Sequence, residues 1–275
     1  MTVLVTGATG TVGRQVVAQL AAAGHPVRAL TRDPAKARLP EGVEVARGDL
    51  TEPDSVAPAL DGVTGLHLIT FGGDDGEPLA TGPRLVELAT RAGVRRVSVL
   101  SGFDRGGVEA ALADSTLPWA HLQPVEFMAN ALEWAESART EGVVRVFGDK
   151  PGSVVHEADI AAVAVAVLTT GGLATAGGSE YPITGPEPLS PRQRVAILAE
   201  AAGRPIRFEP LTEDQERARL AAMGWPPDYV EFGIQLALDP PAEGAAVTPT
   251  VREVTGRPPR TFAQWASEHA AEFRP

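Results

Sequence analysis

The chain has 275 residues, 44% of them hydrophobic and 21% charged, with a formal net charge of −11 at pH 7. This composition indicates an ordinary globular protein, and the acidic balance argues against nucleic acid or an anionic membrane as a partner, because phosphate groups would be repelled. The acidic balance therefore favours a small molecule as the partner. The sequence has no cysteine, which excludes disulfides and thiolate chemistry. Since it has no basic leader and no long apolar run, we expect a cytoplasmic protein.

The first predicted elements are a strand over residues 3–5 and a helix that ends at Gly24, joined by a glycine-rich turn. Gly7, Gly10 and Gly13 lie where the strand passes into the helix, and a second strand follows at residues 27–30. A helix N-terminus presents unpaired N–H groups, and glycines let a pyrophosphate approach because they have no Cβ. The turn therefore predicts a nucleotide-binding loop, with a purely structural turn as the alternative.

Strands and helices continue to alternate up to about residue 122. The pattern predicts further strands at 43–46, 66–70, 97–100 and 119–122, with helices near 55–60, 83–92 and 108–113. This rhythm is typical of an α/β protein with a doubly wound parallel sheet. Ligands of such sheets bind beyond the carboxyl ends of the strands.

The pattern loosens after residue 125 into a helix at 127–138, a strand at 143–147, a helix capped by Asp159 and a strand at 181–184. Three later helix starts have the spacing of a capping box, in which a hydroxyl and an amide satisfy each other's backbone N–H groups. They are Ser190 with Gln193, Thr212 with Gln215, and Thr261 with Gln264. These starts predict a mostly helical C-terminal part.

The C-terminal part also carries large aromatic residues: Trp225, Tyr229, Phe232 and Trp265. Aromatic residues in such a region more often form the core than line a pocket. A helical cap beside strand ends is nevertheless where a substrate pocket would close.

Several motifs together resemble the NmrA-like group of atypical short-chain dehydrogenases, which are NAD(P)-binding proteins that include reductases, isomerases and catalytically silent redox sensors. The matching segments are residues 6–13, 48–50, 123–130, 156–161 and 181–187. The likeness covers essentially the whole chain. It implies a Rossmann-like, NAD(P)-binding domain over residues 1–185, with its core at 1–150, and a smaller, mostly helical substrate-binding cap over 186–275.

The resemblance also implies roles for individual residues in cofactor binding. The glycine loop would contribute Gly7, Thr9, Gly10, Thr11, Val12 and Gly13. Asp49 and Leu50 would meet the adenine edge, and the turn of Thr70, Phe71 and Gly72 would lie under the nicotinamide ribose. The backbone of Pro124, Val125 and Glu126 would meet the carboxamide. Asp49 could equally cap the next turn, and Pro124 could simply kink the exit from a strand.

The end of the second strand predicts which nicotinamide cofactor binds. NAD preference normally places an acidic residue there, to accept the 2'-hydroxyl of the ribose. In this chain Arg32 comes first and Lys36 follows, and both side chains can meet a 2'-phosphate with charge-assisted bonds. We therefore expect NADPH, although a shift of one residue would let Asp33 serve NAD.

The chain departs from the usual catalytic pattern, in which a lysine lowers the pKa of a tyrosine four residues before it. The only tyrosines are Tyr181 and Tyr229, and neither has such a lysine. The corresponding region runs from Ser101 to Gly107, so Ser101 becomes a candidate for the catalytic and the cofactor site. Arg105 falls where the family places lysine or histidine; it would hold the cofactor or simply begin a solvated helix.

Glu126 and His156 are the remaining candidate proton carriers. Glu126 follows the carboxamide loop, but its charge would also suit the first turn of the next helix. His156 would suit chemistry near neutral pH, with a hydrogen-bonded histidine at a domain junction as the alternative. His67 and His121 lie in predicted buried strands, and no histidine spacing suggests a metal site.

The leading hypothesis is NADPH-dependent reduction of a carbonyl, enone, imine or quinone-like small molecule, in a cleft between the Rossmann domain and the cap. A regulatory protein that senses the nucleotide without turning it over is the second hypothesis. An isomerase or epimerase assisted by the cofactor is the third. A homodimer is compatible with the sequence.

Overall fold

The computed structural model describes residues 1–73, 77–101 and 106–275. The chain forms two compact units. Unit 1 comprises Met1–Pro124, Glu157–Ile183 and Thr250–Arg257, and unit 2 comprises Val125–His156, Thr184–Pro249 and Pro258–Pro275. Because both units draw on several chain segments, the division at residues 185 and 186 stays a prediction.

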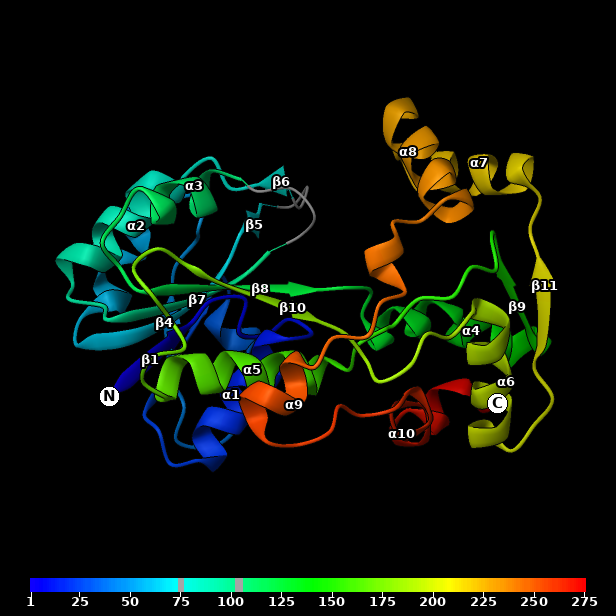
Figure 1. Cartoon of the computed structure of the whole chain (residues 1–275), viewed down its shortest axis with the longest axis horizontal. Coiled ribbons are helices and arrows are strands. Elements are labelled where there is room, and N and C mark those ends of the chain that lie inside the picture. Colours follow the sequence, from blue (N-terminus) through cyan, green and yellow to red (C-terminus); the bar gives the residue numbers. More distant parts are fainter. Residues whose placement is uncertain (74–76, 102–105) are drawn as a thin grey trace. The chain divides into compact units, whose positions relative to one another are not determined.

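Unit 1 is built on a seven-stranded parallel sheet with the order β10-β8-β7-β4-β1-β2-β3 (Figure 1). The strands are β1 (Thr2–Val5), β2 (Val27–Thr31), β3 (Glu44–Arg47), β4 (Val63–Ile69), β7 (Arg96–Leu100), β8 (Trp119–Pro124) and β10 (Ser179–Ile183). The chain runs outward from β1 through β2 to β3 and then returns to the other side of β1 with β4. Strand order therefore reverses between β1 and β4, which is where doubly wound sheets bind ligands.

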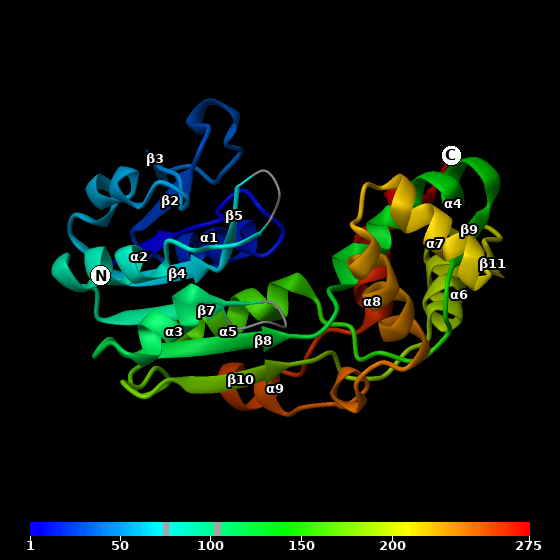
Figure 2. The same cartoon turned by 90° about the horizontal axis from the view of Figure 1, so that it is seen from above.

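Helices cover both faces of this sheet, as Figures 1 and 2 show. One layer contains α2 (Gly82–Arg91) and α3 (Gly107–Ala113), and the other contains α1 (Gly13–Ala22), α5 (Glu157–Thr169) and α9 (Thr250–Thr255). A short hairpin of β5 (Phe71–Gly72) and β6 (Glu77–Pro78) follows β4. The central strands are hydrophobic because both of their faces are covered. The predicted doubly wound α/β class is confirmed.

Unit 2 is mostly helical around a two-stranded parallel sheet of β9 (Val143–Val146) and β11 (Arg207–Pro210). Its α-helices are α4 (Ala135–Glu141), α6 (Pro191–Ala202), α7 (Glu213–Ala222), α8 (Pro227–Leu238) and α10 (Phe262–Glu268). The fully buried Phe262, Trp265 and Phe273 form the centre of its core. Among the described residues, no helix has the length and apolar character needed to cross a membrane.

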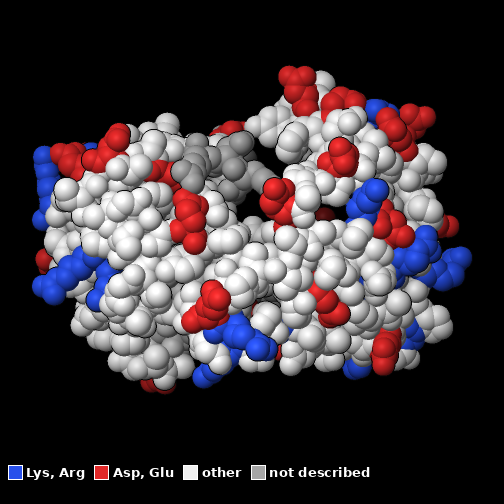
Figure 3. Space-filling view, in the orientation of Figure 1, with Lys and Arg blue, Asp and Glu red and all other residues white. Residues whose placement is uncertain are grey.

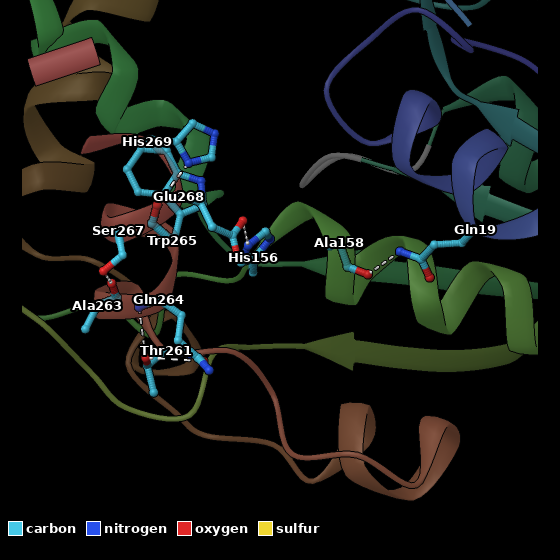
Figure 4. A network of polar contacts seen from close by, with 10 residues as sticks. All are labelled: Gln19, His156, Ala158, Thr261, Ala263, Gln264, Trp265, Ser267, Glu268 and His269. Carbon is cyan, nitrogen blue, oxygen red and sulfur yellow. Dashed lines mark hydrogen bonds and ion pairs between the residues drawn. The ribbon is translucent and has the colours of Figure 1, made fainter. Parts of the chain in front are cut away.

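The three predicted capping boxes are present in unit 2. Ser190, Thr212 and Thr261 each accept from the backbone N–H of the glutamine three residues later, and the glutamine side chain accepts in return. Figure 4 shows the pair of Thr261 and Gln264 at the start of α10. Such pairs satisfy N–H groups that a helix start otherwise leaves open, which explains why these boundaries were predictable.

Three predicted helix boundaries were wrong. Residues 55–60 belong to short 3-10 turns, Pro53–Ser55 and Ala57–Leu60, because Pro58 lacks the N–H that a continuous helix needs. Residues 128–134 form a 3-10 helix before α4, so the predicted helix at 127–138 is divided. The helix α5 begins at Glu157, which places Asp159 inside its first turn, where it is buried and is not the N-cap.

The expectation that His67 and His121 lie in the core is confirmed, since both are buried in the sheet. The imidazole Nδ1 of His67 is 2.8 Å from Ser98 Oγ on the neighbouring strand β7. Burial lowers the pKa of His67 to about 4. The folded sheet therefore favours the neutral imidazole.

Burial of His67 predicts that the protein loses stability on acidification. Between the unfolded pKa near 6.5 and the folded value near 4, the unfolded chain binds more protons, so the free energy of unfolding falls as the pH falls. The full effect is about 3 kcal/mol. Urea unfolding at pH 7, 6 and 5 should show a shallower pH dependence for His67→Gln than for wild type. Equal slopes for the two proteins would contradict the assignment.

Candidate functional site

The carboxyl ends of β1 and β4 are joined by the hydroxyl of Thr6. Thr6 Oγ1 donates to the carbonyl oxygen of His67 at 3.0 Å and accepts from the N–H of Ile69 at 2.9 Å. The next residue, Gly7, has φ of +59° and lies so close to Ile69 that a Cβ would come within 3.0 Å of its side chain. Only glycine suits this backbone and this space, so the turn after β1 is held against the end of β4.

Gly13 fixes the start of α1 against the same turn. A Cβ on Gly13 would come 2.1 Å from the carbonyl oxygen of Gly7, a separation that no side chain could tolerate. Gly10 is different, because a Cβ there would meet only the Gly7 oxygen, at 3.2 Å, and the residue is exposed. The first and third glycines are therefore needed by the fold, while Gly10 leaves an open surface.

The N-terminus of α1 has no side-chain cap. Val12 occupies the N-cap position, and no side-chain hydrogen bond is made there. Thr9, Gly10 and Thr11 form the exposed rim of the loop, and Arg14 donates to the backbone carbonyls of Thr9 (3.0 Å) and Gly10 (3.1 Å). A helix start with uncapped N–H groups behind an open glycine loop fits a phosphate group. Sequence reasoning missed Arg14, which braces this loop.

The end of β2 carries the residues predicted to choose the cofactor. Asp33 accepts from the N–H of Ala35 at 3.2 Å and forms an ion pair of 3.1 Å with Lys36 Nζ. Its carboxylate therefore caps the short 3-10 helix Pro34–Lys36. The side chain of Lys36 is 86% exposed, and Arg32 is exposed as well, so both can be reached by a ligand. Their role toward a 2'-phosphate stays a prediction.

Asp49 also organises a turn. Its Oδ1 accepts from the N–H of Thr51 at 2.9 Å and from the Thr51 hydroxyl at 2.8 Å. These bonds hold the pKa of Asp49 below its ordinary value, with a smaller effect from the nearby charge of Arg32. The Asp49 side chain therefore caps the turn that follows it, which was the alternative to adenine binding. Contact of Asp49 and the buried Leu50 with adenine stays a prediction.

The turn after β4 contains a buried hydroxyl with unused hydrogen-bonding capacity. Thr70 is 3% exposed, and its Oγ1 has no hydrogen-bond partner within the described part of the chain. A buried hydroxyl normally finds a partner, so Thr70 fits a position where a bound molecule completes the site. Phe71 and Gly72 follow in β5, and a Cβ on Gly72 would come 2.5 Å from Leu79.

The remaining predicted cofactor residues lie at the ends of β7 and β8. Ser101 directly follows β7 and is buried, and its N–H donates to the carbonyl of Leu122 at 3.5 Å. Pro124 ends β8, and Val125 begins unit 2. Arg105 lies outside the described residues. Ser101 and Pro124 therefore belong to the carboxyl edge of the sheet, as predicted for a ligand site.

Glu126 is held by an arginine that sequence reasoning did not single out. The Glu126 Oε1 atom accepts from Arg194 Nη1 of α6 at 2.6 Å. The Arg194 side chain is only 6% exposed and lies 5.2 Å from the ring centre of Trp134, whereas the Glu126 side chain is 42% exposed. A buried guanidinium needs an anionic partner, and Glu126 supplies it while remaining open to solvent. No spacing in the sequence connects residues 68 positions apart.

The segment that contains His156 runs beside Glu126. The N–H of Val155 donates to the carbonyl of Glu126 at 2.9 Å, so the backbone segments that carry the two predicted proton carriers are neighbours. His156 itself is 2% exposed, and its Nε2 lies 3.3 Å from Glu268 Oε2 of α10 (Figure 4). This geometry matches a hydrogen-bonded junction histidine more closely than an exposed acid.

Neither tyrosine has the setting of the usual short-chain dehydrogenase acid. The Tyr181 hydroxyl donates to the carbonyl of Leu173 at 2.9 Å, and burial raises the pKa of its phenol. Tyr229 lies on α8 and is 56% exposed. Among the described residues, no group of three or more His, Cys, Asp or Glu side chains is placed to hold a metal ion.

Comparison with known proteins identifies the family. A family model described as NAD(P)H-binding matches residues 7–110. The chain is 40% identical to the (4-alkanoyl-5-oxo-2,5-dihydrofuran-3-yl)methyl phosphate reductase of Streptomyces griseus over 289 aligned residues, which cover 99% of each chain. The chain belongs to the NmrA-like family of atypical short-chain dehydrogenases. The predicted family is confirmed.

Two further comparisons extend this result. This family member is 37% identical to the NAD(P)H azoreductase of Xenophilus azovorans, with 98% of this chain and 99% of the relative covered. The NADPH-dependent quinone oxidoreductase of Escherichia coli, crystallised with NADPH, has a TM-score of 0.78 and 27% identity, over 98% of this chain and 99% of that one. The predicted reductase class and NAD(P)H as cofactor are confirmed at the level of the family.

The open surface at Gly10 predicts a selective loss of cofactor binding. In Gly10→Val the new side chain would occupy the space beside the helix N-terminus, while the fold itself meets only the contact of 3.2 Å with the Gly7 oxygen. We expect Kd for NADPH to rise by more than about 100-fold, or about 2.7 kcal/mol, with Tm little changed. Gly177→Val, where the added Cβ has no atom within 4 Å, is the control. Normal NADPH binding by Gly10→Val in calorimetry would show that the phosphate site lies elsewhere.

The basic residues after β2 predict a preference for NADPH. We expect wild type to bind NADPH at least about tenfold tighter than NADH, which corresponds to about 1.4 kcal/mol, and Arg32→Ala to lose most of this difference. Arg95→Ala removes the same charge at the other end of the strands, before β7, and should leave the preference intact. Equal affinities for the two cofactors in wild type, or an unchanged ratio in Arg32→Ala, would contradict the assignment.

Proposed function

We propose that this chain is an NADPH-dependent reductase of a small molecule with an electron-poor conjugated double bond. The observation that carries the proposal is the uncapped N-terminus of α1 behind the exposed Gly10, at the point where strand order reverses. Phosphate groups bind at such helix ends because the N–H groups and the helix dipole favour negative charge. The family relationship supports the same cofactor.

The residues of unit 1 would each hold one part of the cofactor. The backbone of the loop from Gly7 to Gly13 would bind the pyrophosphate, and Arg32 with Lys36 would bind the 2'-phosphate. The Thr70 hydroxyl, which has no hydrogen-bond partner among residues 1–73, 77–101 and 106–275, would gain a hydrogen bond with the ribose on the nicotinamide side. When bound, NADPH supplies a hydride. The chain's own contribution at this stage is to position the cofactor and to neutralise its charge.

The proton is the second requirement of a reduction, and the chain lacks the usual tyrosine acid. We propose that Glu126 orients a water molecule that gives this proton to the acceptor and leaves as hydroxide, which solvent neutralises. Its Oε1 is bound by Arg194, while its side chain remains 42% exposed, so Oε2 can accept a hydrogen bond from such a donor. The Ser101 hydroxyl would donate a hydrogen bond to the acceptor. His156 remains the alternative carrier, held at Nε2 beside Glu268.

The names of the relatives narrow the acceptor class. One is an azoreductase, one a quinone oxidoreductase and one a reductase of an alkanoyl-dihydrofuranone phosphate. The compounds in these names each contain a double bond that a neighbouring carbonyl or aromatic group makes electron-poor. Such a bond accepts a hydride at one atom and a proton at another. We propose an acceptor with that feature, and we keep the nucleotide sensor as the outcome to test against.

The proposal predicts oxidation of NADPH, followed at 340 nm, by at least one member of a panel of quinones, enones, azo compounds and aromatic ketones. Glu126→Gln keeps a hydrogen bond to Arg194 but loses the anion that orients the donor. We expect this variant to lower kcat by about tenfold or more and to leave Kd for NADPH unchanged.

Glu141→Gln is a matched control, because Glu141 also pairs with an arginine, Arg145 at 2.8 Å, on the surface of unit 2. A larger fall in kcat for His156→Ala than for Glu126→Gln would move the proton-carrying role to His156. If the protein saturates with NADPH, never oxidises it across the panel, and changes its affinity for another protein when the nucleotide binds, the enzyme assignment fails in favour of a sensor.

A further inference from the structure

A patch of large apolar side chains is exposed on the α7–α8 hairpin of unit 2. Its members are Met223, Trp225, Tyr229 and Phe232, and each side chain is between 41% and 58% exposed. For the three aromatic residues and for Trp265, the sequence favoured a place in the core, with pocket lining as the alternative. In the structure only Trp265 is buried, so the aromatic patch needs another explanation.

Helix α8 has a wider apolar face than unit 2 covers. Val230 and Ile234 are buried, whereas Tyr229 and Phe232 lie three residues apart on the adjoining side of the helix and are exposed. Trp225 lies alongside, because its ring comes within 3.6 Å of where a Cβ on Gly233 would be. The glycine leaves room for the indole, so Trp225 lies against the same helix that carries Tyr229 and Phe232.

The charges of the hairpin indicate what this surface can bind. Residues 213–238 contain five acidic and two basic residues, which gives a net charge of −3, and Figure 3 shows acidic side chains gathered over α7 and α8. Both arginines are held within the hairpin: Arg217 pairs with Glu213 and Glu231, and Arg219 pairs with Glu216. A neutral or cationic ligand therefore suits the patch better than an anionic one.

The size of the patch indicates a small molecule. Aromatic side chains can bury about 150–250 Å² each, so three of them at about half exposure offer on the order of 300 Å². A stable protein interface needs about 800 Å² from each partner. The aromatic patch by itself is smaller than such an interface, and it matches one face of a molecule with two fused rings.

We propose that the aromatic patch of α7–α8 binds the flat aromatic body of a neutral or cationic acceptor, with Trp225, Tyr229 and Phe232 as the contacts that determine specificity. The identification of this ligand as the acceptor rests on the proposed reductase function. The binding itself does not, because aromatic stacking and apolar burial require no cofactor.

The test is a fluorescence titration with menadione, an uncharged naphthoquinone, in the absence of NADPH. Trp225 is 41% exposed, Trp134 is half-buried, and Trp119 and Trp265 are buried. Quinone bound at the patch should therefore quench Trp225, and Trp225→Phe should lose that part of the signal, so that any quenching left in this variant comes from Trp134. We expect Phe232→Ala and Tyr229→Ala each to raise Kd by about tenfold. Val247→Ala, a 51% exposed valine outside the patch, should not change Kd. A naphthoquinone sulfonate should bind at least about threefold more weakly than menadione.

Kinetics and mass measurements complete the test. Phe232→Ala should raise KM for menadione and leave kcat and Kd for NADPH unchanged. Unchanged quinone Kd and KM in Phe232→Ala and Tyr229→Ala would overturn the inference even if wild type oxidises NADPH. Loss of a dimer in Phe232→Ala, with quinone binding intact, would instead assign the patch to a protein interface and also overturn it. Quenching of Trp225 without NADPH oxidation by any acceptor would refute the reductase function alone.

Discussion

The close approach of Gly13 to the carbonyl of Gly7 is the constraint on which the cofactor site depends. A Cβ at Gly13 would come within 2.1 Å of that oxygen, so α1 can begin directly beside the end of β1 only because both positions are glycine. Thr6 then joins β1 to β4 at the reversal of strand order. The helix N-terminus is thereby presented at the carboxyl edge of the sheet, where its free N–H groups can meet an anion.

Unit 2 depends on a buried charge in a comparable way. The buried Arg194 of α6 is neutralised by Glu126, and its guanidinium lies over the ring of Trp134. Since an unpaired buried arginine is costly, this ion pair orders the backbone from which Glu126 extends. The same carboxylate is the proposed partner of the proton donor. A structural and a chemical requirement therefore meet in one residue, which is why a glutamine substitution is more informative than an alanine substitution.

The two units contribute different chemistry. In the proposals made above, unit 1 binds a polyanionic nucleotide through backbone N–H groups, an arginine and a lysine, whereas the hairpin of unit 2 binds through aromatic rings within an acidic surface. In the proposed function an overall acidic protein binds NADPH because two of its cations, Arg32 and Lys36, lie together after β2. The acidic character of α7 and α8 would then direct neutral or cationic acceptors to the aromatic surface and discourage anionic ones.

The sequence by itself determined the parallel sheet, the glycine loop and the capping boxes, because each is encoded by residues close together in the chain whose backbone or spacing requirement is local. It also indicated the family and the loss of the tyrosine acid. Only the tertiary structure decided which side chains are buried and paired. Arg194 pairs with Glu126 and His156 with Glu268, while the Thr70 hydroxyl finds no hydrogen-bond partner among the described residues. The exposure of Trp225, Tyr229 and Phe232 was likewise decided by the tertiary structure. Burial and long-range pairing depend on how distant segments pack against one another, and this packing cannot be predicted from a periodic pattern along the chain.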